Sequence, residues 1–138
     1  MEIARDWLGR RAVVQVAPGV RAKFLLKYQT LVVGTLSVED GIWQFDYSEE
    51  FKQDGQLRPL VEFPELDISY QSADLWQFFA MRIPSAEQPE VEEILRREEI
   101  LEDDAVGLLR RFGKRTIANP FELTVAEFPP SPAYRVVL

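Results

Sequence analysis

Two residue types that carry much of protein chemistry, cysteine and histidine, are absent from this chain of 138 residues. Without cysteine there are no disulfides, no thiolate metal sites and no cysteine nucleophiles. Without histidine, His-dependent triads and HExxH metal sites are excluded, as is the usual base that titrates near neutral pH. A catalyst would have to use Asp, Glu, Lys or Tyr, or a metal held by oxygen alone. We therefore expect that the protein is not an enzyme and that it has no catalytic residues, no cofactor and no bound metal.

Glycine is scarce and lacks the spacing of a phosphate-binding loop. The seven glycines form neither G-x-G-x-x-G nor G-K-[ST], the motifs that cradle nucleotide phosphates. Protein kinases also need an H-R-D type catalytic loop, which a chain without histidine cannot supply. The sequence is therefore not expected to act as a kinase by itself.

Long apolar runs are missing as well. Stretches such as Phe24 to Leu26 and Leu31 to Val33 are far shorter than a transmembrane helix requires. The first residues, MEIARDWLGRR, carry charges and no apolar segment typical of a secretory signal. We expect a cytoplasmic protein that does not bind membranes.

Basic residues are outnumbered, 16 against 23 acidic ones, for a formal net charge of −7. The negative net charge argues against direct nucleic-acid binding, because such binding requires Lys and Arg side chains to neutralise the phosphates. An acidic surface serves solubility and would also suit a basic protein partner. One basic cluster stands out: Arg110, Arg111, Lys114 and Arg115. It fits the C-terminal turn of a helix, where cations are favoured, or a contact with phosphate or an acidic partner.

Alternating and β-branched segments are the main feature of the first half. They predict strands over residues 12–17, 22–28, 30–38 and 42–47. Glu39, Asp40 and Gly41 supply the turn between the last two. The row Trp43, Phe45 and Tyr47 lies on one face and is either the core face of a sheet or an aromatic surface for a partner. Gly34 within a strand indicates a bulge or a close backbone approach.

Helical patterns follow. Ser48 is predicted to cap a single turn that stops at Gly55, and Ser72 to cap a helix that Pro84 ends. Further helices are predicted over about 90–100 and from Asp103–Asp104 to Gly113. Asp103 and Asp104 could be read as a pair of metal ligands, but acids favoured at a helix N-terminus are the simpler explanation. Strands are expected again over 121–128 and 133–138. This order predicts one α+β domain over residues 1–138, with a mainly antiparallel sheet and about three helices packed on one side.

Four stretches together resemble the N-terminal subdomain of the HipA family of bacterial toxin kinases. They are VVGTLSVEDGIWQFDYSEEF (32–51), RPLVEFP (58–64), LWQFFAMRIPS (75–85) and EVEEILRREEILEDDAVGLLRRFG (90–113). The resemblance is strongest over 32–113, while residues 114–138 diverge from the family. Another departure is Ile83-Pro84-Ser85-Ala86, where the family has a Leu-Leu-Pro-Glu-Gly type turn.

The resemblance implies a non-catalytic module that binds and neutralises a HipA-like serine/threonine kinase in a toxin–antitoxin system, in a complex that can include a DNA-binding antitoxin. Because the chain ends where such a kinase would begin its ATP-binding part, we expect a stand-alone small subunit. The expected partner-binding residues are Trp76, Arg82, Ile83, Pro84, Ser85, Glu39, Asp40 and Gly41. The alternative is a scaffold protein that forms a homodimer through its helix face or its C-terminal strands.

Overall fold

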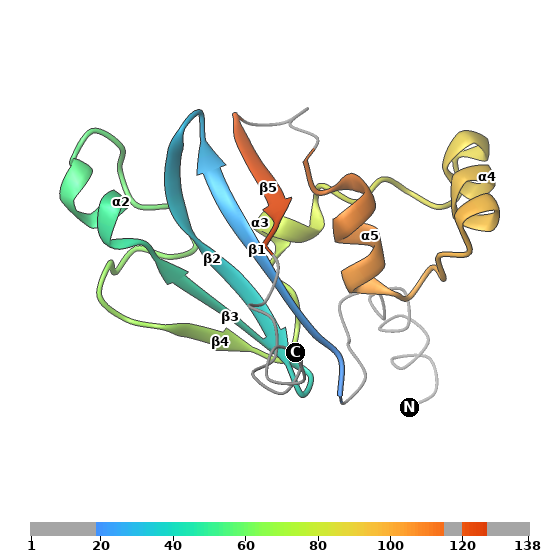
Figure 1. The fold of residues 1–138 in the computed structure, drawn as a ribbon, viewed down its shortest axis with the longest axis horizontal. Coiled ribbons are helices and arrows are strands. Elements are labelled where there is room, and N and C mark those ends of the chain that lie inside the picture. Colours follow the sequence, from blue (N-terminus) through green and yellow to red (C-terminus); the bar gives the residue numbers. More distant parts are fainter. Residues whose placement is uncertain (1–18, 115–119, 127–138) are drawn as a thin grey trace, which may run out of the picture.

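The computed structural model describes residues 19–114 and 120–126 and contains a five-stranded antiparallel sheet of order β4-β3-β2-β1-β5 (Figure 1). The strands are β1 (Arg21–Tyr28), β2 (Leu31–Glu39), β3 (Ile42–Tyr47), β4 (Tyr70–Ser72) and β5 (Phe121–Val125). The helices are α2 (Glu49–Asp54), α3 (Gln77–Ala80), α4 (Pro89–Glu98) and α5 (Ala105–Phe112). The α+β class with a mainly antiparallel sheet is confirmed. The strands predicted over 12–17 and 133–138 lie outside the described residues.

The three central strands form because apolar side chains occur at every second position. Phe24 and Leu26 on β1 and Leu36 on β2 are fully buried on the inner face. Trp43, Phe45 and Tyr47 on β3 are buried beside them, so the core interpretation of this aromatic row is confirmed and its use as an exposed surface is excluded. Each such side chain contributes about 1.5–3 kcal/mol when it leaves water.

Gly34 on β2 lies where the β3 backbone and the Phe45 ring leave no room for a side chain. A Cβ at this position would lie 2.5 Å from the carbonyl oxygen of Asp46, well inside van der Waals contact. The register between β1 and β2 also shifts here, between Leu26 and Lys27, so that one β2 residue is passed over. Both features predicted for this glycine, a bulge and a close approach, are present.

Helix α2 begins and ends where the sequence predicts. The Ser48 side chain accepts a hydrogen bond from the Phe51 N–H, and Gly55 ends the helix in the left-handed conformation, with φ of 74°. The same Ser48 hydroxyl donates to the carbonyl of Val32 on β2. One serine therefore caps the helix and fastens it to the sheet.

The helix predicted after Ser72 is wrong in its start and length. Ser72 is the last residue of β4 and pairs with Trp43 of β3, and only the four residues of α3 are helical. The Ser72 hydroxyl accepts from the Asp74 N–H in a local turn, a bond that serine makes as readily outside a helix as at its N-cap.

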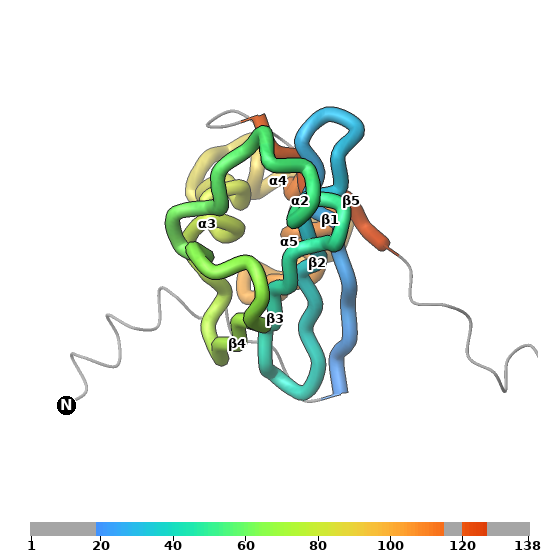
Figure 2. Tube along the Cα trace, turned by 90° about the vertical axis from the view of Figure 1, so that its left-hand side faces the viewer, coloured from blue at the N-terminus to red at the C-terminus, as the bar shows by residue number. Residues whose placement is uncertain are grey.

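Helices α4 and α5 match their predicted ranges, but α4 does not cover the sheet. Figure 1 shows it at the far end of the molecule, beyond α5. Val91 and Leu95 of α4 pack on Leu108 and Phe112 of α5 in a second, smaller core. The prediction of three helices packed on the sheet is corrected to this extent. Figure 2 shows α3 and the loop before β4 on the same side of the sheet.

No helix in the described part of the chain combines the length and the apolar character needed to cross a bilayer.

Candidate partner-binding surface

The β2–β3 hairpin tip is accessible and has a fixed backbone. Asp40 and Gly41 have φ of 55° and 79°, the positive values of a tight two-residue hairpin turn. Glu39 forms an ion pair with Arg21 at 3.6 Å, in which both side chains are more than half exposed, and pairs of this kind contribute little to stability. Glu39 and Asp40 are thus presented to solvent on a rigid support.

Trp76 lies at the boundary of the core rather than on the open surface. It is the residue before the first turn of α3, and its ring meets Phe63 edge-on at 5.0 Å between centroids. A second edge-on contact joins it to Phe79 at 6.4 Å. Only part of the indole is left for a partner.

Arg82 is buried, with 7% of its surface exposed. Its Nη1 donates to the carbonyl of Phe121 at 2.8 Å and to that of Gly113 at 3.3 Å, and the guanidinium lies 5.6 Å from the centre of the Phe78 ring. Burial lowers the pKa of Arg82, an effect that the charge of Glu122 opposes. The prediction of a direct partner contact does not fit this environment; Arg82 instead joins α3, the end of α5 and the start of β5.

The turn after Arg82 connects the two cores. Ile83 packs against both the sheet core and the α4–α5 core. Pro84 is half-buried, and Ser85 is exposed, with its hydroxyl accepting from the Glu87 N–H at 3.1 Å. In Figure 1 this region is separate from the β2–β3 tip, which lies at the lower end of the sheet. The predicted residues therefore form two sites, and only part of each is accessible.

Loop 57–66 contains the RPLVEFP stretch of the family resemblance and is held by a buried tyrosine, a tie that the sequence analysis did not predict. The Tyr47 hydroxyl donates to the carbonyl of Phe63 at 2.6 Å and accepts from the N–H of Leu60 at 2.8 Å. Burial raises the pKa of Tyr47 to about 12, with the Leu60 hydrogen bond acting in the opposite direction. Val61, at the apex of this turn, is 95% exposed.

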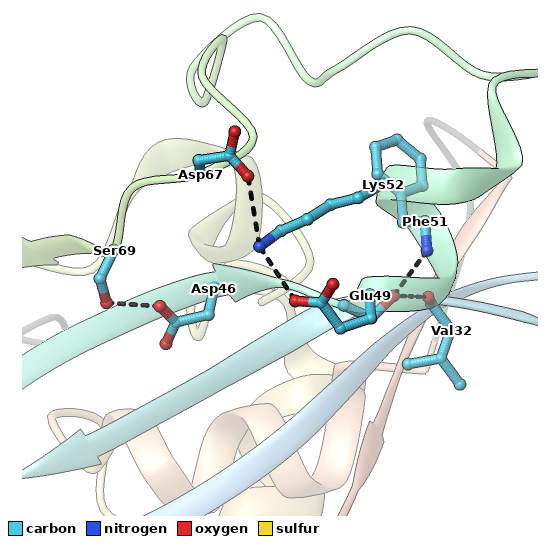
Figure 3. Close-up of polar contacts among 8 residues, drawn as sticks. Val32, Asp46, Glu49, Phe51, Lys52, Asp67 and Ser69 are labelled. Carbon is cyan, nitrogen blue, oxygen red and sulfur yellow. Dashed lines mark hydrogen bonds and ion pairs between the residues drawn. The ribbon is translucent and has the colours of Figure 1, made fainter.

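Polar side chains fasten the rest of this region to the sheet (Figure 3). Lys52 of α2 lies 3.2 Å from Glu49 and 3.6 Å from Asp67, and the Glu49 hydrogen bond is the main cause that raises the pKa of Lys52. Ser69 donates to Asp46 on β3. Glu49 and Asp67 are largely exposed, so their ion pairs with Lys52 add little to stability. Within 19–114 and 120–126 no three potential ligands gather as a metal site.

Leu101 is a second exposed apolar residue that sequence patterns did not reveal. At seven residues after Ile94 it falls on the apolar stripe that a continued α4 would have. Glu99 ends the helix in the left-handed conformation, which turns the chain and leaves Leu101 70% exposed. A local stop of this kind gives no signal in the hydrophobic pattern.

The family of this chain follows from a comparison with known protein families. The model of the HipA N-terminal domain matches residues 25–118. The chain belongs to this family. The match extends the resemblance expected over 32–113 and reaches from within β1 through α5, and β5 lies outside the matched residues. A comparison with curated proteins gives no significant match.

Proposed function

We propose that this HipA N-terminal domain is a non-catalytic, cytoplasmic binding module that regulates, by neutralising it, a HipA-like serine/threonine kinase of a toxin–antitoxin system. The observation that carries the proposal is the family match over residues 25–118. This span includes β2, β3, β4, the second half of β1 and all four helices of the described chain, so the proposal concerns most of the folded unit.

The internal chemistry supports a binding role. The buried Tyr47 hydroxyl and the Arg82 guanidinium are engaged with main-chain carbonyls or amides, and both act as supports for loops. Neither forms the combination of nucleophile, base and electrostatic stabiliser that a catalytic site requires. A partner would instead meet rigid surface features.

We assign two surfaces of this domain to kinase binding. One is the hairpin tip, Glu39 to Gly41, and the other is the accessible part of the 83–85 turn together with the exposed edge of Trp76. Arg82 acts on the second surface indirectly, because its bonds to Gly113 and Phe121 fix the chain from which the turn departs. Rigid presentation favours binding since less conformational entropy is lost on association.

The test is a direct affinity measurement against a HipA-type kinase from the same genome, with kinase activity recorded in parallel. Wild-type domain is expected to bind and to lower the activity. Replacing Glu39→Gln and Asp40→Asn together keeps the turn, since Asn tolerates positive φ, and is expected to weaken binding by about threefold to tenfold. The matched control is Glu62→Gln with Glu65→Gln, in loop 57–66. A kinase that neither binds nor responds to the wild-type domain would refute the proposal.

A homodimer is the second candidate, favoured by the position of β5. This strand is an edge of the described sheet, and Val125 near its end is 45% exposed. Strand edges of this kind are templates for pairing with another chain. Light scattering on the purified protein separates the two: a mass of one chain at working concentration excludes the dimer.

A further inference from the structure

The whole net charge of the protein is concentrated in one short segment. Residues 87–104 contain nine acidic and two basic residues, a net of −7, which equals the formal net charge of the full chain. The other 120 residues carry 14 charges of each sign. The acidity of this protein is therefore a local property and not a general feature of its surface.

The structure places this segment at one end of the molecule, where it forms α4 and the connection to α5 (Figure 1). Helix α4 packs through Val91 and Leu95 on α5, and all nine acidic residues of the segment are exposed. Two of them have structural roles: Glu98 accepts from Arg111 at 2.9 Å and Asp104 caps α5. The outer face of α4 and the connection has no partner element within the described residues.

Leu101 lies in the middle of these carboxylates and is held there by the backbone. The N–H of Ile100 donates to the carbonyl of Leu95 at 2.8 Å, and the N–H of Asp104 donates to the carbonyl of Leu101 at 3.1 Å. Between these two bonds Leu101 packs in neither hydrophobic core and has 70% of its surface exposed. An apolar side chain on a fixed turn with a charged rim has the composition of an interface anchor.

We propose that Leu101 and the carboxylates around it, Glu99, Glu102 and Asp103, dock a Lys/Arg-rich surface of the kinase that this domain regulates. The inference rests on the proposed function and adds a second contact surface to it. The charge of the segment determines the chemistry of the occupant: it repels nucleic acid and anionic lipid and attracts a cationic protein surface. Leu101 supplies the apolar centre that charge alone lacks.

The experiment compares four forms of the full chain against the same HipA-type kinase, at two salt concentrations of about 50 and 300 mM. They are the wild type, Leu101→Ser, the triple variant Glu99→Gln/Glu102→Gln/Asp103→Asn, and the control triple variant Glu50→Gln/Glu62→Gln/Glu65→Gln. The two triple variants change the net charge equally. All six acidic side chains and Leu101 are exposed, so circular dichroism and thermal unfolding are expected to match the wild type.

At low salt we expect Leu101→Ser and the first triple variant each to weaken binding by about tenfold, and the control by less than about twofold. The dependence on salt should become shallower in the first triple variant and stay unchanged in Leu101→Ser. If the kinase binds the wild type and both test variants equally well, this inference is wrong while the proposed function stands. Equal losses in the two triple variants would also overturn it, since only overall charge would then matter. A wild-type domain that does not bind the kinase overturns both.

Discussion

Replacing Tyr47 by Phe tests how loop 57–66 is held. The ring of Tyr47 stacks on Phe51 at 5.0 Å and meets Phe45 edge-on at 5.1 Å, and phenylalanine keeps both contacts. Only the hydroxyl is lost, and with it the hydrogen bonds to the Phe63 carbonyl and the Leu60 N–H. Both bonds are in the interior, so no solvent replaces them.

The magnitude follows from the two main-chain groups that lose their partner. A buried polar group without a hydrogen bond costs about 1–3 kcal/mol, so we expect the loss of two such bonds to lower the free energy of unfolding by roughly 2–6 kcal/mol. That is a large part of the roughly 5–15 kcal/mol that stabilises an ordinary domain. Urea unfolding followed by tryptophan fluorescence measures it, because Trp76 contacts Phe63 of the same loop.

Tyr70→Phe is the matched control. The Tyr70 hydroxyl also holds the backbone of this loop, accepting from the Glu65 N–H at 2.7 Å and donating to its carbonyl at 3.1 Å, but these bonds are exposed to solvent. Water can take the place of the hydroxyl, so the loss should stay below about 1 kcal/mol. Equal losses in the two variants would refute the reasoning, since burial would then not decide the effect.

Four further measurements test other parts of the fold. Gly34→Ala places a methyl group 2.5 Å from the Asp46 carbonyl oxygen and should lower the melting temperature by an amount equivalent to about 1–3 kcal/mol; an unchanged melting curve would contradict the close approach. Ser48→Ala removes the α2 cap and should cost about 1 kcal/mol in urea unfolding. Arg82→Met keeps the aliphatic length but deprives two carbonyls of a donor, and amide hydrogen exchange in β5 should become faster, whereas unchanged exchange would exclude its role as a tie. The raised pKa of Tyr47, about 12 against 10.0, means that the folded state retains this proton longer; stability is fully present below pH 10 and should fall by up to about 2 kcal/mol as the pH rises to 12, a loss that Tyr47→Phe should not show.

The central strands and α4 and α5 could be predicted from the sequence because their patterns are local and consistent. Side chains alternate along residues 22–47, and Asp104 and Pro89 stand where a helix begins. In these segments propensity, capping and burial favour the same structure. The family resemblance added the assignment to the HipA N-terminal domain family, which the match over 25–118 confirms.

The segment from Ser72 to Ile83 shows where local patterns fail. Its apolar residues have helical spacing, yet Ser72 is taken up by pairing with Trp43 at the sheet edge. The partner strand lies about 30 residues earlier in the chain, so a pattern read over a short window of sequence cannot reveal the pairing. Pairing with β3 overrides the helical spacing of the segment that begins at Ser72, because sheet formation depends on contacts with a neighbouring strand as well as on local preference.

The candidate site was harder to predict than the fold, because the residue types that suggest recognition are the ones that cores also use. Tryptophan and arginine are enriched at interfaces, but Trp76 lies against Phe63 and Arg82 holds two loop ends together. Leu101, which a sequence pattern assigns to the interior, is on the surface. Exposure in this domain is decided by where the backbone turns.

Residues that support a binding surface of this domain differ from residues that form it in their effect on stability. Under the proposed function, a substitution at Arg82 is expected to weaken partner binding by loosening the chain that presents the 83–85 turn, and stability should fall in the same variant. A substitution at Asp40 or Leu101 leaves the packed interior intact, so it should change affinity alone. The ratio of the two effects therefore separates residues that support a surface from residues that form it, and it does so without a structure of the complex.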